Sequence, residues 1–230
     1  MSKVIRPAPK ESAAEQTKKA HLILKHAHDT ARALLHAFDN IRKARGARGG
    51  ATTDEEQDLL RAMVVFAAAG LDSMLKQLVR EALPTIVGRN EAAQAEVETY
   101  AARKIRGPAE DPDAIGGTKF LARLLSGASP QSRLVDALVQ DLTSGSLQSV
   151  EELNRSVKYL GLDPKEVGVG VTDLRPVFLI RNKIIHELDI DFDHPTRNRS
   201  IRRRDDMVQH CNSLLEVAQK ILRAVDTSVK

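Results

Sequence analysis

The stretch "TDEEQDLLRAMVVFAAAGLDSMLKQLV", residues 53–79, decides the fold class. Thr53, followed three residues later by Glu56, predicts a capping box, in which each side chain accepts a hydrogen bond from the other residue's backbone N–H. Apolar residues then recur every three or four positions, which predicts one long helix with a buried face. These apolar positions are Leu59, Leu60, Met63, Phe66, Leu71, Leu75 and Leu78. We therefore expect a central core helix.

Helical patterns continue on both sides of this stretch. Upstream, the same period runs from Ala13 to Ala44, and "ARGARGGATT" follows as a flexible loop. Downstream, "GPAEDPDAIGG" is the clearest loop, and no run favours a strand. Further helices are predicted at 91–105, 118–126, 130–142 and 149–160, at the stretch after Asp173, and from about 205 to 225. The expected fold is an all-α multi-helix bundle with no sheet.

We expect two regions within this bundle. Residues 1–50 form an N-terminal helical arm with its arginine and glycine loop, packed on or beside the bundle, and residues 51–230 form the main helical domain. The single cysteine, Cys211, cannot form an internal disulfide and is interpreted as a packing residue of a cytosolic protein. The longest apolar run, residues 62–71, is too short to span a bilayer. We therefore expect a cytoplasmic protein without a membrane partner.

Composition also bears on the partner. Aromatic residues make up 3% of the chain and tryptophan is absent, which argues against the aromatic platforms of single-strand RNA binders. The formal net charge of +4 permits an anionic partner without requiring one. Nucleophile elbows, phosphate-cradling glycine loops and paired cysteines are absent, and many enzyme classes are thereby excluded.

The stretch "RNKIIHELD", residues 181–189, places a cation inside an apolar stripe. With Asp173 as the expected cap, the stripe contains Leu174, Val177, Phe178, Ile184, Ile185 and Leu188. At about 100° per residue Arg181 falls in its middle, so its guanidinium must be paired or must open onto a cleft or a partner. His186 lies one turn beyond Asn182, so these two side chains can meet. The alternative is that Arg181 pairs with an acid on a neighbouring helix while His186 faces solvent.

The residues Arg181-Asn182-Lys183-Ile184-Ile185-His186 resemble the signature of the HEPN superfamily, and the upstream helix is similar to the RiboL-PSP type. The resemblance covers about residues 55 to 227. It implies an all-α bundle of HEPN type and a metal-independent ribonuclease that acts as a homodimer, with a toxin or antiphage defence role and an antitoxin or regulatory partner. Leu188 stands where nucleotidylated HEPN toxins carry tyrosine, so we do not expect that control.

A second match to the signature joins Arg204 to His210. Its arginine precedes the expected helix cap Asp205, so the pair would straddle a helix start. We therefore prefer the pair formed by Arg181 and His186.

Cleaving RNA without a metal requires a base for the ribose 2′-proton, an acid for the departing 5′-oxygen and positive charge on the phosphate. One histidine per chain cannot readily perform both proton transfers, but two chains related by a twofold axis can. His186 would serve as base or acid, Arg181 would clamp the phosphate, and Asn182 would orient His186 or the phosphate. No cofactor is expected.

Five arginines follow in "RNRSIRRR": Arg197, Arg199, Arg202, Arg203 and Arg204. Near a nuclease cleft they would bind the RNA backbone, with affinity that falls steeply as salt rises. Alternatively they form a solvated loop, or pair with acids such as Asp205 and Asp206. "RKARGARGG" is interpreted as a solvated loop rather than a nucleic-acid contact.

Two sets of residues suggest metal binding instead. The stretch "HELDIDFDH" supplies His186, Glu187, Asp189, Asp191, Asp193 and His194 as candidate ligands. It equally fits an extended segment that packs Leu188, Ile190 and Phe192 on one face, and we expect no metal. The N-terminal histidines are expected at the surface, and they are His21, His26, His28 and His36.

The sequence therefore predicts an endoribonuclease of HEPN type that acts on RNA. One alternative is a HEPN-fold module that binds RNA, a nucleotide or a protein without cleaving. Another is a helical nucleic-acid-binding regulator, in which the arginine run matters and His186 does not.

Overall fold

The computed structural model describes residues 4–8, 14–46, 51–106, 115–126, 129–170 and 172–230. Over these residues the chain is helical and forms no sheet, so the predicted all-α multi-helix bundle is confirmed. The elements are η1 (Glu15–Thr17), α1 (Lys18–Ala44), α2 (Asp54–Glu81), α3 (Leu83–Val87), α4 (Glu91–Arg106), α5 (Ile115–Leu125), α6 (Pro130–Ser144), α7 (Val150–Tyr159), α8 (Arg175–Glu187) and α9 (Arg204–Ser228).

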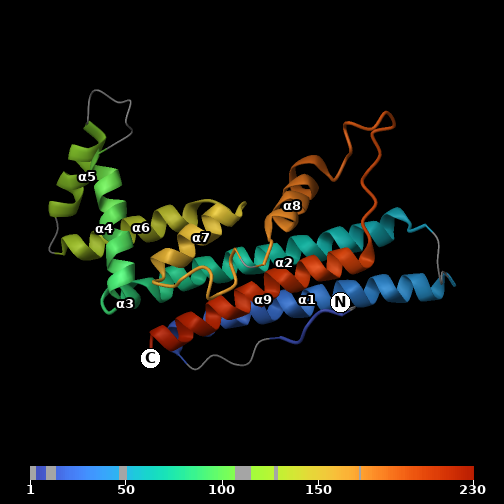
Figure 1. Cartoon of the computed structure of the whole chain (residues 1–230), viewed down its shortest axis with the longest axis horizontal. Coiled ribbons are helices and arrows are strands. Elements are labelled where there is room, and N and C mark those ends of the chain that lie inside the picture. The colour runs from blue at the N-terminus through green and yellow to red at the C-terminus, as the bar shows by residue number, and fades with distance from the viewer. Residues whose placement is uncertain (1–3, 9–13, 47–50, 107–114, 127–128, 171) are drawn as a thin grey trace.

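The three long helices α1, α2 and α9 lie side by side and form the body of the molecule (Figure 1). The most extensive packing joins α1 to α2, and α9 also packs on α2. Gly70 of α2 lies where α1 comes closest, because a Cβ built on it would be 2.2 Å from the Cβ of Ala27. The small residue therefore allows the two longest helices to pack along their length.

The start of α2 follows the predicted capping box. Thr53 Oγ1 accepts a hydrogen bond of 3.3 Å from the Glu56 N–H, and Glu56 Oε2 accepts one of 3.1 Å from the Thr53 N–H. Arg42 and Arg45, at the end of α1, also form ion pairs with the buried Glu56 carboxylate, at 3.1 and 3.0 Å. These two arginines of "RKARGARGG" are thus structural, while residues 47–50 of that stretch lie outside the described residues.

Most of the predicted core of α2 is confirmed, but Phe66 is not part of it. Leu60, Met63, Leu71, Leu75 and Leu78 are buried, Leu59 is half-buried, and Phe66 is 51% exposed. The run "AMVVFAAAGL" is apolar around the whole helix, so periodicity cannot indicate which side faces solvent. By length and composition alone α2 could cross a membrane, but 56% of the apolar window is buried inside the bundle, as in an ordinary core helix.

The N-terminal segment 4–8 runs back along the bundle. The Arg6 N–H donates to Asn212 Oδ1 at 2.9 Å, and Asn212 Nδ2 donates to the Val4 carbonyl at 3.0 Å. The segment covers His28, whose Nδ1 is 3.2 Å from the Arg6 carbonyl oxygen. The prediction that the N-terminal histidines lie at the surface is therefore wrong for His28, which is buried.

The shorter helices α3 to α7 gather at one end of the body (Figure 1). Their boundaries follow local signals: Ser149 Oγ accepts from the Glu152 N–H at 3.2 Å before α7, and Gly161, with φ 69°, ends it. The predicted loop at 107–117 is too long, because α5 already begins at Ile115, while residues 107–114 lie outside the described residues. The short helix α3 was not predicted.

Candidate functional site

Helix α8 carries the predicted site, packs on α2 and is inclined to the three long helices (Figure 1). Its N-cap is Leu174 rather than the predicted Asp173, although Asp173 Oδ1 accepts from the Arg175 N–H at 3.2 Å. Leu174, Val177 and Phe178 are buried as predicted.

The second half of the predicted apolar stripe of α8 is partly wrong. Ile184 is half-buried, but Ile185 is exposed and Leu188 is 64% exposed. The reason is that α8 ends at Glu187, so Leu188 adopts a left-handed conformation and leaves the helix face.

Arg181 lies half-buried on the packed side of α8, as its position in the stripe predicts. Its Nη1 donates a hydrogen bond of 2.8 Å to Asn182 Oδ1. It forms no ion pair with a carboxylate anywhere in the described part of the chain. The alternative, in which Arg181 pairs with an acid on a neighbouring helix, is therefore wrong for the described residues.

The amide of Asn182 joins α8 to the segment before α7. Its Nδ2 donates to the Gln148 carbonyl oxygen at 3.2 Å while its Oδ1 accepts from Arg181. The expected contact between Asn182 and His186 is absent from the described hydrogen bonds, because both ends of the amide are already engaged. His186 is exposed near the end of α8, as the alternative interpretation expects, and makes no hydrogen bond or ion pair with the other described residues.

An uncovered apolar side chain lies on the same side of α8 as His186. Leu179 is 70% exposed and precedes His186 by seven residues, or about two helical turns, so the two share one face. Asn182 lies between them on this face. The outer face of α8 therefore combines an exposed leucine with the exposed imidazole.

The chain leaves α8 in an uncommon backbone conformation. Leu188 has φ 52° and Asp189 has φ 62°, and the third positive φ outside glycine among the described residues belongs to Arg197, at 48°. All three thus lie within ten residues. Left-handed conformations cost about 1 kcal/mol or more for such residues and persist only where the surrounding structure enforces them.

At this turn the Asp189 N–H donates to the Lys183 carbonyl at 3.1 Å, and the carboxylate of Asp189 is fully buried. Its Oδ2 accepts from Arg61 Nε at 2.9 Å and from Arg202 Nε at 3.0 Å, and Arg202 Nη2 contacts the other oxygen. Burial raises the pKa of this carboxyl, but the two guanidiniums outweigh burial, so the pKa of Asp189 lies below its usual value. We call the cluster of Arg61, Asp189 and Arg202 the buried triad; no sequence signal indicates it.

The buried triad also bears on the metal alternative. Asp189 was one of the candidate ligands in "HELDIDFDH", but its two oxygens already accept hydrogen bonds from guanidiniums. Within the described ranges no three His, Cys, Asp or Glu side chains are placed to hold a metal ion.

Residues 190–199 form a projecting hairpin (Figure 1). An isolated bridge pairs Ile190 with Arg199, and the Asp191 N–H donates to the Asn198 carbonyl at 2.9 Å. Ile190 is half-buried, whereas Phe192 is 58% exposed. The interpretation of this stretch as an extended segment that packs Leu188, Ile190 and Phe192 on one face is therefore wrong, because Leu188 and Phe192 face solvent.

Three of the five arginines proposed to bind RNA are engaged in ion pairs. Arg199 pairs with Asp58 at 2.7 Å, Arg202 belongs to the buried triad, and Arg204 contacts both oxygens of Asp39 at 2.8 and 2.7 Å. Asp58 and Asp39 lie far away in the sequence, and Asp189 lies 13 positions before Arg202, whereas the predicted acid Asp205 contributes one bond to Arg204, at 3.1 Å.

The other two arginines are open to solvent. Arg203 is 86% exposed, with only a contact of 4.0 Å to Asp206, the other acid that we predicted. Arg197 is exposed and has no ion pair among the described residues. These two remain the candidates for binding an anion.

The second signature match is also placed. Helix α9 begins at Arg204 after the N-cap Arg203, so the predicted cap at Asp205 is wrong. Arg204 and His210 therefore lie on one helix and do not straddle a helix start, contrary to the prediction. The guanidinium of Arg204 is, however, already held by Asp39. Cys211 is buried, as predicted.

Comparison with models of protein families, with curated proteins and with solved structures finds no significant match to this chain.

Proposed function

We propose that this chain is a metal-independent endoribonuclease of HEPN type, whose active site forms between two copies from Arg181, Asn182 and His186 of each. The observation that carries the proposal is the half-buried guanidinium of Arg181, which is held by Asn182 and has no carboxylate partner in the described residues. A cation that is partly desolvated and unpaired is costly. An RNA phosphate would supply the negative charge that the guanidinium of Arg181 lacks.

Asn182 gives Arg181 a fixed direction without neutralising its charge. Its Oδ1 is a neutral acceptor, and its Nδ2 is held by the Gln148 carbonyl. The full positive charge thus remains for the phosphate oxygens, on which negative charge grows in the transition state. Arginine can donate two parallel hydrogen bonds to a phosphate, which positions it as well as neutralising it.

His186 supplies the proton transfers in this proposal. One imidazole removes the 2′-proton, the 2′-oxygen attacks phosphorus, and the bond to the 5′-oxygen breaks as a second imidazole donates its proton. The products are a 2′,3′-cyclic phosphate and a 5′-hydroxyl. Because this motif supplies one histidine per chain, the second comes from a twofold-related copy.

The outer face of α8 supports such an assembly. Leu179 and Ile185 of α8 are exposed, as is Leu188 directly after the helix, and Leu179 shares a face with His186. Across a twofold axis, one α8 would cover these side chains with those of the other, and the same axis would bring the two imidazoles together. The toxin or antiphage role, and an antitoxin or regulatory partner, belong to this proposal only through the resemblance of the motif.

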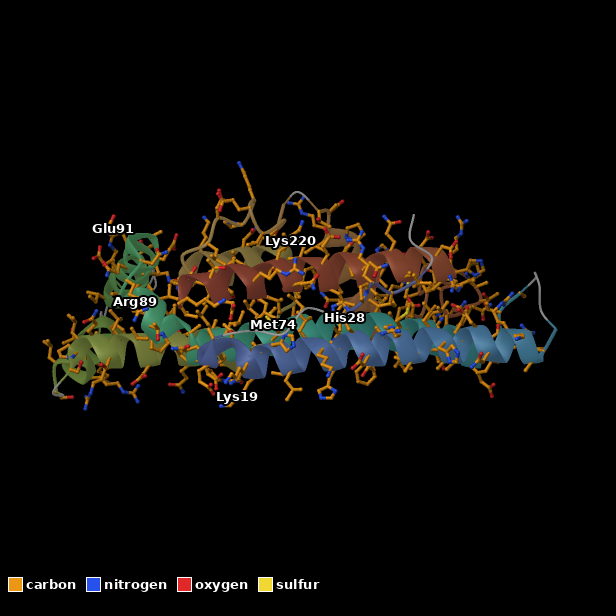
Figure 2. All side chains as sticks on the ribbon, turned by 90° about the horizontal axis from the view of Figure 1, so that it is seen from below. Lys19, His28, Met74, Arg89, Glu91 and Lys220 are labelled. Carbon is orange, nitrogen blue, oxygen red and sulfur yellow. The ribbon has the colours of Figure 1, made fainter. Side chains whose placement is uncertain are left out.

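The test is cleavage of mixed RNA in excess EDTA. We expect the full chain to cleave, and His186→Ala to lower the rate by about a hundredfold to ten-thousandfold, since that is the usual contribution of a general acid or base. Arg181→Ala should also be severely impaired. His26→Ala and Arg89→Ala are the matched controls, because both side chains are exposed and Arg89 lies near α3, toward the end away from α8 (Figures 1 and 2).

The outcomes separate the possible reactions. Activity that EDTA abolishes would contradict the proposal and favour metal chemistry. Circular dichroism of each variant, matching that of the unmodified chain, ensures that a lost activity is not a lost fold.

A module that binds RNA without cleaving it is the second candidate. It is favoured by the exposed state of His186, which has no described hydrogen-bond partner to fix its ring. RNA binding that persists in His186→Ala, with no product formed by either protein, would support this candidate.

A further inference from the structure

The tip of the hairpin 190–199 presents an aromatic ring to solvent. Among the phenylalanines and tyrosines that the structure describes, only Phe66 and Phe192 are more than half exposed, at 51% and 58%. Phe66 lies on α2 in the body, whereas Phe192 lies on the projecting hairpin (Figure 1). A single exposed apolar residue needs no explanation by itself. The surroundings of Phe192 are what distinguish it.

The residues that follow Phe192 in the turn carry hydrogen-bonding groups, whereas the exposed apolar side chains nearest in sequence, Leu188 and Ile201, lie at the feet of the hairpin. Exposed carboxylate, imidazole, hydroxyl, guanidinium and amide side chains follow it directly, and they belong to Asp193, His194, Thr196, Arg197 and Asn198. A protein partner that buried Phe192 would also bury apolar neighbours, and apart from Pro195 residues 193–198 supply none. A flat ring bordered by donors and acceptors fits a ligand that is itself a flat ring with polar edges.

The hairpin is held in place so that this tip is presented. The buried triad fixes one foot at Asp189, and Arg61 Nη2 donates to the Ser200 carbonyl at 2.8 Å to fix the other. The foot at Asp189 follows His186 by three residues. The left-handed backbone of Arg197 lies at the tip itself. Strain of this kind gathers at functional sites and is maintained by rigid surroundings.

We propose that the hairpin tip binds an unpaired nucleobase of the RNA, which stacks on the ring of Phe192 while Arg197 contacts its phosphate or base edge. This inference rests on the proposed function in that the nucleotide belongs to the RNA cleaved beside His186. Single-stranded RNA fits, because its bases can turn outward onto an aromatic ring, whereas the bases of a duplex are stacked on one another.

The charges at the tip indicate how such binding responds to salt. Arg197 is accompanied by the carboxylates of Asp191 and Asp193, so the tip has no positive surplus. A contribution from stacking therefore does not depend on counterion release, and the effect of removing the ring should be similar at low and high salt. Arg203, which is exposed and nearly unpaired, should instead contribute a salt-dependent part.

The experiment measures binding of an unstructured RNA of about ten nucleotides, made with 2′-fluoro ribose so that attack by the 2′-oxygen cannot occur. We expect Phe192→Ala to weaken binding by about tenfold or more, as stacking on an aromatic ring usually contributes. Phe192→Trp should preserve binding, whereas Phe192→Leu, which keeps an apolar side chain without a ring, should bind as weakly as Phe192→Ala. Phe66→Ala is the matched control and should bind normally.

Several results would overturn the inference. They are normal binding by Phe192→Leu, equal weakening by Phe66→Ala, or equal weakening toward a duplex of the same sequence. Weakening that follows conversion of a dimer into monomers, seen by sedimentation, would show that Phe192 contacts a second copy instead. Because the RNA cannot be cleaved, binding that depends on Phe192 can be found even if His186 proves inactive, and cleavage can be found even if Phe192 proves irrelevant.

Discussion

Arg181 and Asn182, adjacent in α8, are joined by a hydrogen bond of 2.8 Å from the guanidinium Nη1 to the amide Oδ1. Adjacent residues on a helix project about 100° apart, so this contact draws the arginine toward the side of α8 that carries Asn182 and His186. The bond therefore links the packed face of α8 to its exposed face, where a phosphate could approach.

Asn182→Asp tests this relationship. It would place a carboxylate against Arg181 with almost no change in shape, so the guanidinium would be neutralised from within the chain. We expect RNA cleavage to fall by about tenfold or more, since a hydrogen bond to a charged group contributes about 1.5–3 kcal/mol. Asn40→Asp, at an exposed position on α1, is the control for the added charge. Undiminished cleavage by Asn182→Asp would show that Arg181 is not the phosphate clamp.

Leu179→Asp tests the twofold dimer contact that we propose for the outer face of α8. A carboxylate on each copy would be buried beside its symmetry mate, where like charges repel. We expect sedimentation to show a dimer for the unmodified chain and a monomer for the variant, with cleavage lost together with the dimer. Leu22→Asp, at an exposed leucine on α1, should remain dimeric. A monomeric unmodified chain that cleaves RNA would refute the shared site.

Asp189→Asn tests the buried triad. The substitution keeps the shape but leaves the guanidiniums of Arg61 and Arg202 without their shared counter-charge in a buried place. Removing one partner of a buried ionic group typically costs about 3–5 kcal/mol. We therefore expect urea unfolding to show a loss of about 3 kcal/mol in the free energy of unfolding. Asp136→Asn, at an exposed position on α6, should change it by less than about 0.5 kcal/mol.

The stability of the fold should decline in mild acid. Burial is the largest cause that lowers the pKa values of His28 and His210 below 6.5 in the folded chain. As the pH falls below about 6.5 the unfolded chain therefore binds more protons than the folded chain, and the free energy of unfolding decreases. Urea unfolding between about pH 7 and pH 5 measures this decrease. The double variant His28→Gln, His210→Gln should show a shallower dependence, and an unchanged slope would contradict the assignment.

The helices could be predicted because their signals are local. The capping box of Thr53 and Glu56, the cap at Ser149 and the stop at Gly161 each act within a few residues. Periodicity likewise placed Arg181 on the packed face of α8. Local signals did not reveal that α9 begins at Arg204, because the N-cap Arg203 forms no side-chain capping bond.

The contacts that shape the candidate site could not be predicted, because they join distant residues. Arg61 and Asp189 are 128 positions apart, and nothing in either neighbourhood indicates the other. The contact holds the foot of the hairpin at Asp189, so the sequence alone did not indicate the direction of the hairpin or the exposure of Phe192. The low aromatic content argued against a stacking platform, yet one well-placed ring is enough for one base.

In the proposed reaction His186 promotes attack by the 2′-oxygen of the RNA itself. The chemical nature of the new RNA ends tests this reaction most directly. A defined RNA oligonucleotide is incubated with the chain in EDTA. A parallel reaction uses the same oligonucleotide with 2′-deoxyribose at the cleaved nucleotide, and the products of both are identified by mass spectrometry. We expect a 2′,3′-cyclic phosphate and a 5′-hydroxyl from the first, no product from the second, and little or no product from either with His186→Ala. Cleavage of the deoxy-substituted strand, or products that end in a 3′-hydroxyl and a 5′-phosphate, would contradict it.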